Sequence, residues 1–226
     1  MRTRILLLTV AILAAVAFSV TAGERTVTIT GAEVTLPEIG DVAENFSLFG
    51  VDLRYHSLNM YRDSRAIVLI FTCNHCPVSI AYEDYLVKLA NEYQPKNIQF
   101  IAFNTNPVDK VARDGFPQMI ERAEEKKFPF PYLYDETQTV SHAYGARRTP
   151  HIYVLGPADG EGRRRFIYIG AVDARHEEPF YLKNALEAIL AGEEISPRET
   201  EARGCTVKYR TRDERVARFG YDVFAK

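Results

Sequence analysis

Two cysteines, Cys73 and Cys76, stand at the end of an apolar run and are followed at once by Pro77. Residues 67–71 read Ile-Val-Leu-Ile-Phe, which has the length and β-branched content of a buried strand. A proline is tolerated in the first turn of a helix, and residues 80–93 carry apolar side chains at helical spacing. The sequence therefore predicts a strand-to-helix junction with both thiols at the helix N-terminus.

This junction is typical of a redox-active dithiol. A thiol at a helix N-terminus meets the positive end of the helix dipole and free backbone N–H groups, which favour the reactive thiolate. Disulfide exchange needs an attacking thiolate and a second thiol within reach, and the Cys73–Cys76 spacing supplies both. His75 would stabilise the thiolate if it is protonated or donates a hydrogen bond. The alternative is that His75 is a solvent-exposed residue without redox effect.

Two structural interpretations of the cysteine pair are weaker. Half of a zinc site would need further ligands, and the sequence has only Cys205 as another cysteine and no histidine pair at zinc-finger spacing. A structural disulfide across so short a loop would remove little chain entropy. Cys205 itself has three interpretations: an inert, semi-buried residue, a relay partner of Cys73 or Cys76, or a link between two chains.

The N-terminus has the build of a secretory signal peptide. A short basic region precedes a nearly continuous apolar stretch, residues 5–20, and small residues at Ala22 offer a cleavage site. We predict that residues 1–22 are removed on export to the periplasm or another extracytoplasmic compartment, where disulfides persist. An uncleaved membrane anchor is the alternative. The net charge of −2 at pH 7 indicates neither nucleic acid nor an acidic membrane as partner.

Beyond the signal, strands and helices follow the order β–α–β–α–(β)–α–β–β–α, which is that of a thioredoxin fold with an inserted βα unit. The fold class is α/β, with a central mixed sheet flanked by helices. We assign residues 37–191 to this domain and residues 192–226 to a C-terminal extension. One edge strand is expected in residues 23–36, and two short strands around a turn at Gly50 form an N-terminal hairpin extension. The other predicted elements are strands at 98–103, 132–134, 151–155 and 164–170 and helices at 116–127, 137–144 and 179–191.

Several further segments carry a family resemblance when they are taken together. They are Gly40-Asp-Val-Ala43-x-x-Phe46-x-Leu48, Phe71-Thr-Cys-Asn-His-Cys-Pro77, Pro131-Tyr-Leu-Tyr-Asp135, Tyr144-Gly-Ala146, Thr149-Pro150 and Gly204-Cys205-Thr-Val-Lys. With them the chain resembles the redoxin (AhpC/TSA-like) branch of the thioredoxin superfamily, and it is most similar to exported TlpA/ResA-like thioredoxins. The resemblance covers about residues 37–209.

The resemblance implies roles for individual residues. Cys73 would be the attacking cysteine, exposed at the helix start, and Cys76 the resolving cysteine. Pro150 would be a cis-proline facing the dithiol, and Thr149 would offer backbone groups to a bound substrate peptide in strand-like pairing. TlpA-like members often carry an acid three residues after the second cysteine. This chain has Ser79 there, and Glu83 comes later.

Three other polar residues are candidates for the site. Asn104 and Asn106 end a strand beside the expected dithiol, and they either line the site or form a turn before Pro107. His151 follows Pro150 and is either an ordinary strand residue or a copper ligand.

The leading prediction is an exported thiol–disulfide oxidoreductase acting on protein disulfides through Cys73 and Cys76. The expected direction is reduction, fed by a membrane or soluble electron donor, with no cofactor and no bound metal. One alternative is a thiol-dependent peroxidase using Cys73, although the peroxiredoxin signature Pro-x-x-x-Thr-x-x-Cys does not precede that cysteine. The other is a copper-binding chaperone using the two cysteines and His151.

Overall fold

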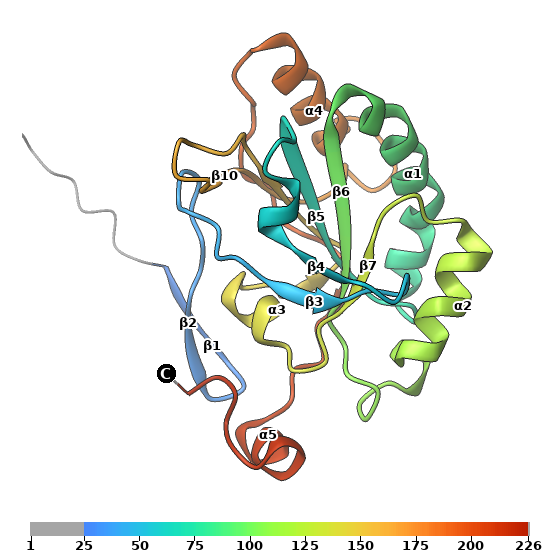
Figure 1. The fold of residues 1–226 in the computed structure, drawn as a ribbon, viewed down its shortest axis with the longest axis vertical. Helices are drawn as coiled ribbons and strands as arrows, with labels where there is room; N and C mark the ends of the chain where they lie inside the picture. The colour runs from blue at the N-terminus through green and yellow to red at the C-terminus, as the bar shows by residue number, and fades with distance from the viewer. Residues whose placement is uncertain (1–24, 226) are drawn as a thin grey trace, which may run out of the picture.

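The computed structural model describes residues 25–225, so the predicted signal peptide lies outside the described residues. The centre of the fold is a five-stranded mixed sheet with the strand order β10-β9-β5-β6-β7 (Figure 1). Its strands are β5 (Ala66–Thr72), β6 (Ile98–Asn104), β7 (Tyr132–Tyr134), β9 (His151–Leu155) and β10 (Phe166–Gly170). β5, β6 and β7 run parallel. On the other side of β5, β9 pairs antiparallel with β5, and β10 pairs antiparallel with β9. The predicted thioredoxin fold with a mixed sheet is confirmed.

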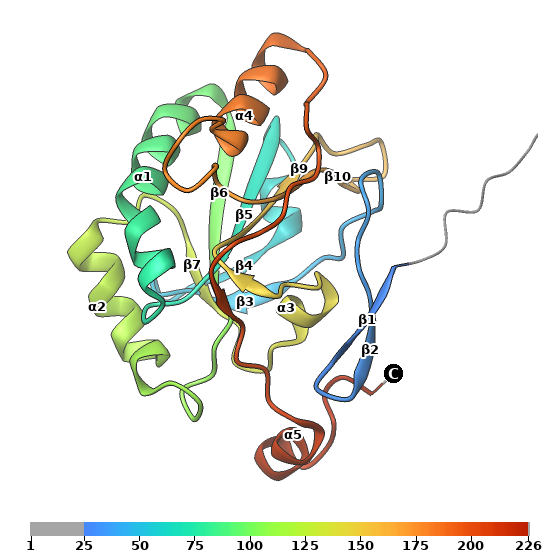
Figure 2. The same cartoon turned by 180° about the vertical axis from the view of Figure 1, so that it is seen from behind.

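Helices cover both faces of this sheet (Figures 1 and 2). The helices are α1 (Pro77–Tyr93), α2 (Phe116–Lys126), α3 (Thr139–Ala143) and α4 (Tyr181–Ala191), with short 3-10 turns η1 (Leu58–Tyr61), η2 (Gln94–Lys96) and η3 (Ala112–Asp114). Val68 and Ile70 of β5 pack with α1 and α4, whereas Phe71 packs in a second core with Val140 and Tyr144. β5 is buried on both faces, which explains why it reads as a continuous apolar run.

The N-terminal part contains two hairpins. β3 (Ser47–Phe49) and β4 (Tyr55–Ser57) pair antiparallel, as the pattern around Gly50 predicted. The prediction of one edge strand over residues 23–36 is wrong, because the chain folds back on itself as β1 (Thr26–Ile29) and β2 (Ala32–Thr35). Thr30 and Gly31 form the turn with φ of 47° and 85°, which a glycine adopts at little cost.

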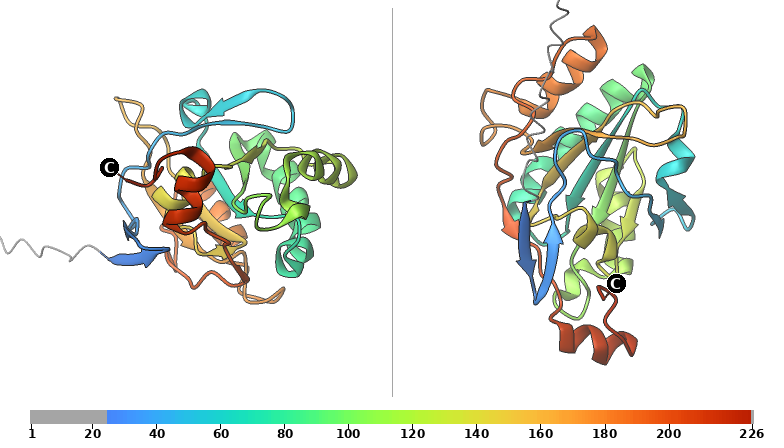
Figure 3. Two further views of the ribbon diagram at one scale, coloured as in Figure 1. Left: turned by 90° about the horizontal axis from the view of Figure 1, so that it is seen from below. Right: turned by 90° about the vertical axis from the view of Figure 1, so that its left-hand side faces the viewer.

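The tail (residues 192–225) crosses the molecule from α4 to the opposite end (Figure 2). It first forms a bridge from Glu199 to Ile169 of β10. β11 (Cys205–Thr206) then pairs antiparallel with β8 (Arg148–Thr149), and the tail ends in α5 (Arg212–Phe219). Figure 3 shows α5 at the same end of the molecule as the β1–β2 hairpin, where Arg215 donates a 3.1 Å hydrogen bond to Thr30.

Within residues 25–225, no helix combines the length and the apolar character needed to cross a membrane.

Candidate active site

The two cysteines lie where β5 gives way to α1. Cys73 follows β5, and Cys76 is the N-cap of α1 with Pro77 in the first turn. Both cysteines are free thiols, with exposed fractions of 1% for Cys73 and 0% for Cys76. The peptide bond before Pro150 is cis, as expected. Thr149 contacts both sulfur atoms: its Oγ1 lies 3.5 Å from Cys73 Sγ, and its carbonyl oxygen lies 3.3 Å from Cys76 Sγ.

A hydrogen bond between the two thiols separates their pKa values. Accepting this bond lowers the pKa of Cys76 to about 3 despite burial, and the thiol of Cys205 and the N–H of Ser79 also donate to the Cys76 sulfur. Donating the bond raises the pKa of Cys73 well above its ordinary value, and burial adds to the rise. Cys76 donates to the Thr149 carbonyl when it carries its proton. When Cys76 is ionised, the thiols of Cys73 and Cys205 and the N–H of Ser79 stabilise its thiolate.

The expectation that Cys73 is exposed at the helix start is wrong. Cys73 instead lines an internal cavity of about 10 Å³ together with Glu83 and Tyr132, so its side chain points into the protein. Such a volume holds about one water molecule. Burial raises the pKa of Glu83, although Arg122 binds both of its carboxylate oxygens at 2.6 and 3.0 Å and acts in the opposite direction. TlpA-like members often carry an acid three residues after the second cysteine, where this chain has Ser79. In this structure the acid beside Cys73 is Glu83.

Asp114 holds the dithiol loop (residues 73–76) and was not predicted from the sequence. Its carboxylate is fully buried and accepts four hydrogen bonds. Oδ1 accepts from the backbone N–H groups of Asn74 (2.8 Å) and His75 (3.1 Å), and Oδ2 accepts from His75 Nδ1 (2.6 Å) and Asn106 Nδ2 (3.0 Å). In the sequence, Asp114 precedes a predicted helix, where an acid is an ordinary choice because of the helix dipole. No separate signal therefore marks it.

The two asparagines belong to the same network. Asn104 donates to the carbonyl oxygen of Asp114 at 2.5 Å, and its side chain is fully buried. Asn106 donates to the Asp114 carboxylate and also accepts a 2.7 Å hydrogen bond from the backbone N–H of Lys208 in the tail. Asn106 therefore connects the support of the dithiol loop to the tail.

His75 and His151 occupy different environments. His75 is tied to Asp114, with a side chain only 17% exposed, so the solvent-exposed alternative is wrong. In residues 25–225, the one set of three possible metal ligands with donor atoms within 4.8 Å of one another is Cys73, His75 and Asp114. His151 is outside that set; its Nδ1 hydrogen-bonds Tyr153 at 3.0 Å. Burial, aided by Arg147, lowers the pKa of His151 to about 3.

The tail covers the edge of β8 next to the dithiol. In the pairing of β11 with β8, Cys205 is directly opposite Thr149. Gly204 approaches so closely that a Cβ there would lie 2.0 Å from the Thr149 carbonyl oxygen. The resemblance implies that a substrate peptide pairs with Thr149 at this edge of β8. In this structure the tail of the same chain pairs there.

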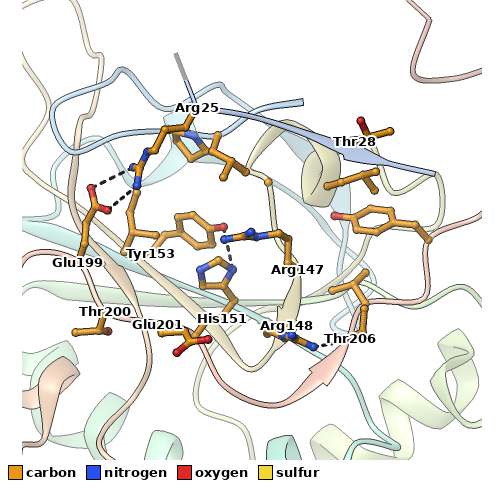
Figure 4. Close-up of a pocket in the computed structure, with 18 of the residues that line it drawn as sticks. Arg25, Thr28, Arg147, Arg148, His151, Tyr153, Glu199, Thr200, Glu201 and Thr206 are labelled. Carbon is orange, nitrogen blue, oxygen red and sulfur yellow. Dashed lines mark hydrogen bonds and ion pairs between the residues drawn. The ribbon is translucent and has the colours of Figure 1, made fainter. Parts of the chain in front are cut away.

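A cavity of about 830 Å³ lies on the other side of the β8–β11 ribbon (Figure 4). Arg147, His151 and Tyr153 converge there from β9 and the segment before it, and Arg25 closes one wall with an ion pair to Glu199. None of the three cysteines lines this cavity. The ribbon therefore separates it from the dithiol.

Residues 39–169, more than half of the chain, match the family model described as AhpC/TSA. The chain belongs to the AhpC/TSA family. A crystal structure of an uncharacterized conserved protein from Geobacillus kaustophilus is 33% identical to this redoxin, with a TM-score of 0.71 and coverage of 79% of this chain and 96% of that chain. A search of curated proteins gave no match.

Two more distant structures show the same fold. A hypothetical protein from Sinorhizobium meliloti is 24% identical, with a TM-score of 0.70 and coverage of 83% of this chain and 98% of that chain. A peroxidoxin from Mycobacterium tuberculosis is 17% identical, with a TM-score of 0.53 and coverage of 69% and 97%. Family membership, together with the dithiol, supports an oxidoreductase of the redoxin kind.

Proposed function

We propose that this redoxin is an exported thiol–disulfide oxidoreductase that reduces protein disulfides through Cys73 and Cys76. The observation that carries the proposal is the pair of buried free thiols at the start of α1, both in contact with Thr149 beside the cis-proline Pro150. A thiol pair that keeps one sulfur ionised is prepared for exchange, because the thiolate is the nucleophile and also the base beside its partner.

In the proposed reaction, the tail strand separates from β8 to admit the substrate. Cys73 attacks one sulfur of the substrate disulfide while its proton passes along the hydrogen bond to the Cys76 thiolate. The first substrate sulfur leaves as a thiolate and takes a proton from solvent. Cys76 then attacks Cys73 Sγ in the mixed disulfide, and its proton goes to the second leaving sulfur. The products are a Cys73–Cys76 disulfide and two substrate thiols, so two electrons pass from the protein to the substrate.

Export and the direction of electron flow come from the sequence. The predicted signal, residues 1–22, would place the protein where disulfides persist and where a reductase needs a membrane or soluble electron donor. The reductase direction follows from the resemblance to TlpA/ResA-like proteins.

The redox equilibrium of the purified mature protein with glutathione tests this proposal, read by thiol alkylation and mass. We expect one two-electron couple in Cys205→Ser, where only Cys73 and Cys76 remain, and its loss when Cys73→Ser or Cys76→Ser is added to that variant. A potential near about −270 mV indicates a reductase and one near about −120 mV an oxidase. Retention of disulfide exchange in either double variant contradicts the proposed pair.

A second candidate activity is a thiol-dependent peroxidase. It is favoured by the tail, which occupies the strand edge that a protein substrate would use, whereas a hydroperoxide needs no such edge. Cys73 would attack the peroxide oxygen and become a sulfenic acid, and Cys76 would condense with it to give the disulfide and water. Hydrogen peroxide consumption with dithiothreitol as reductant tests this activity, and the rate should fall to background in Cys73→Ser.

A further inference from the structure

The tail presents its own cysteine to the dithiol in the manner of a bound substrate strand. Residues directly opposite each other in an antiparallel pair have side chains on the same face. Thr149 faces Cys73, with 3.5 Å between Oγ1 and Sγ, so the opposed Cys205 lies on the dithiol face as well. Its neighbour Thr206 faces the other way, where its Oγ1 accepts a 2.7 Å hydrogen bond from Arg148.

Cys205 lies opposite Thr149, the residue that both sulfurs of the pair contact. Hydrogen bonding of the Cys205 thiol to Cys76 and of the Val78 N–H to Cys205 contributes to the pKa shifts of these two thiols. Thr149 joins all three cysteines, because its Oγ1 donates to the carbonyl oxygen of Cys205 at 3.5 Å.

The three sulfurs differ in access from outside. Cys73 and Cys76 are buried completely or nearly so, whereas Cys205 is partly exposed. A thiol that reduces a disulfide must approach one of its sulfur atoms directly. While the tail is paired with β8, a disulfide between Cys73 and Cys76 is therefore shielded, and Cys205 is the most exposed of the three cysteines.

We propose that Cys205 is a third redox cysteine, which takes over the disulfide from the Cys73–Cys76 pair and passes it to the external electron donor. This inference rests on the proposed function. The Cys205 thiolate attacks Cys76 Sγ, the bond between Cys73 and Cys76 breaks, and the Cys76–Cys205 bond forms. Cys73 leaves as a thiolate and takes up the proton that Cys205 released, so the oxidation level of the protein does not change.

Re-reduction then proceeds at the accessible sulfur. One thiolate of an external dithiol attacks Cys205 and releases Cys76, and the second thiol of that donor attacks the mixed disulfide. The donor leaves as a disulfide, and its two protons end on Cys76 and Cys205. Two electrons thus reach the buried pair without opening of the dithiol loop.

The charge on Cys76 gives this transfer its order. In the reduced centre, burial raises the pKa of Cys205 to about 11, with the hydrogen bond to Cys76 and the charge of Cys76 as the next causes. Once Cys76 is in a disulfide, its charge and its hydrogen bond are gone. Cys205 then becomes easier to ionise when there is a disulfide for it to attack.

Peptide mapping of the oxidised wild-type protein tests the proposal without any substitution. The reduced protein is oxidised with one equivalent of diamide, quenched with acid at a series of times, alkylated and digested with trypsin. Cleavage after Arg65, Lys88, Arg203 and Lys208 places Cys73 and Cys76 in one peptide and Cys205 in another. We expect the Cys73–Cys76 disulfide first and a cross-linked pair of peptides later.

Three variants assign the bond and the electron path. Cys73→Ser should form the Cys76–Cys205 disulfide, and Cys76→Ser should form an intramolecular disulfide at least about tenfold more slowly. Oxidised Cys205→Ser should be re-reduced by dithiothreitol at least about tenfold more slowly than wild type. Thr206→Ala is the matched control, because this side chain lies in the same strand and faces away from the thiols; it should behave as wild type.

The outcomes separate this inference from the proposed function. A Cys73–Cys76 disulfide that forms and exchanges, with no cross-linked peptide at any time and a wild-type rate of reduction in Cys205→Ser, overturns the third-cysteine role alone. Failure of the Cys73–Cys76 disulfide to form at all overturns both. If Cys205→Ser does not fold, the wild-type peptide map still decides.

Discussion

The dithiol loop and the tail strand meet at Thr149, but the structure holds them in different ways. The loop is held by the fully buried carboxylate of Asp114, which accepts four hydrogen bonds. The tail strand has two residues, and it is kept in place by its pairing with β8 and by single contacts such as that from Lys208 N to Asn106. Elements with few buried contacts open at lower free-energy cost. The redox centre therefore has a rigid half, the dithiol loop, and a separable half, the tail strand β11.

The largest effect should come from the rigid half. Asp114→Ala leaves the partly buried N–H groups of Asn74 and His75 without their acceptor, and each such loss costs about 1–3 kcal/mol. We expect the free energy of unfolding to fall by about 3 kcal/mol in urea titrations. Asp114→Asn keeps an acceptor oxygen and should lose less. Equal stability of Asp114→Ala and wild type would show that the network does not hold the loop.

A smaller effect is expected where the tail meets β8. Gly204→Ala would place a Cβ 2.0 Å from the Thr149 carbonyl oxygen, on a backbone with φ of +142°. An alanine there must move away, and β11 after it must shift from β8. We expect a loss of about 1–3 kcal/mol and faster alkylation of Cys76. Gly160→Ala is the control, because nothing lies within 4 Å of the position that a Cβ would take there. An unchanged alkylation rate in Gly204→Ala would mean that the tail does not shield the thiol.

The same contrast explains what the sequence could predict. The dithiol loop is a local pattern, in which an apolar strand, two cysteines and Pro77 are adjacent in the chain. Its position, the cis bond before Pro150 and the mixed sheet could therefore be predicted. The direction of Cys73 could not, because whether a side chain points inward depends on the cavity formed with Glu83 and Tyr132 from other elements.

The tail was predicted only as a C-terminal extension over residues 192–226, without strands or helices. Two-residue strands carry no periodic pattern, so β11 is determined by its long-range partner β8. α5 has a local signal in Thr211 and Glu214, which form a capping box, but its polar composition conceals it. Asp114 is a third case, because its acceptor role depends on backbone groups far away in the sequence.

The ionisation of Cys76 tests whether the rigid half controls the thiols. Because its pKa is lowered to about 3, Cys76 stays a thiolate in the folded protein at pH values where the unfolded chain, with a pKa of about 8.5, is protonated. The resulting stabilisation of the fold is complete above about pH 8.5 and is lost as the pH falls through about 3. Cys73→Ala removes the largest cause of the shift and should raise the pKa of Cys76. Cys73→Ser keeps a hydroxyl donor and should raise it less. The ultraviolet absorbance of the thiolate, followed against pH, gives both values, and identical curves for the two variants would contradict hydrogen bonding from residue 73 as the cause of the lowered pKa.

The smallest effect is expected at the end of the tail. Thr211 Oγ1 accepts a hydrogen bond from Glu214 N, and Glu214 Oε2 accepts one from Thr211 N at 2.7 Å. Thr211→Ala removes half of this capping box and should destabilise α5 by about 1 kcal/mol, whereas Thr211→Ser retains the acceptor. Hydrogen exchange should therefore become faster for the amides of α5 in Thr211→Ala only.

The amides of the β8–β11 ribbon should keep their exchange rates in the same experiment. Arg210 lies between the ribbon and α5, with a fully buried side chain that pairs with Asp109 and donates to the Glu136 carbonyl at 2.6 Å. Because these contacts precede the cap, opening of α5 should stop there and leave Cys205 opposite Thr149. Faster exchange at Thr149 and Thr206 would show instead that the tail opens as one unit, so that release of α5 would also uncover the dithiol.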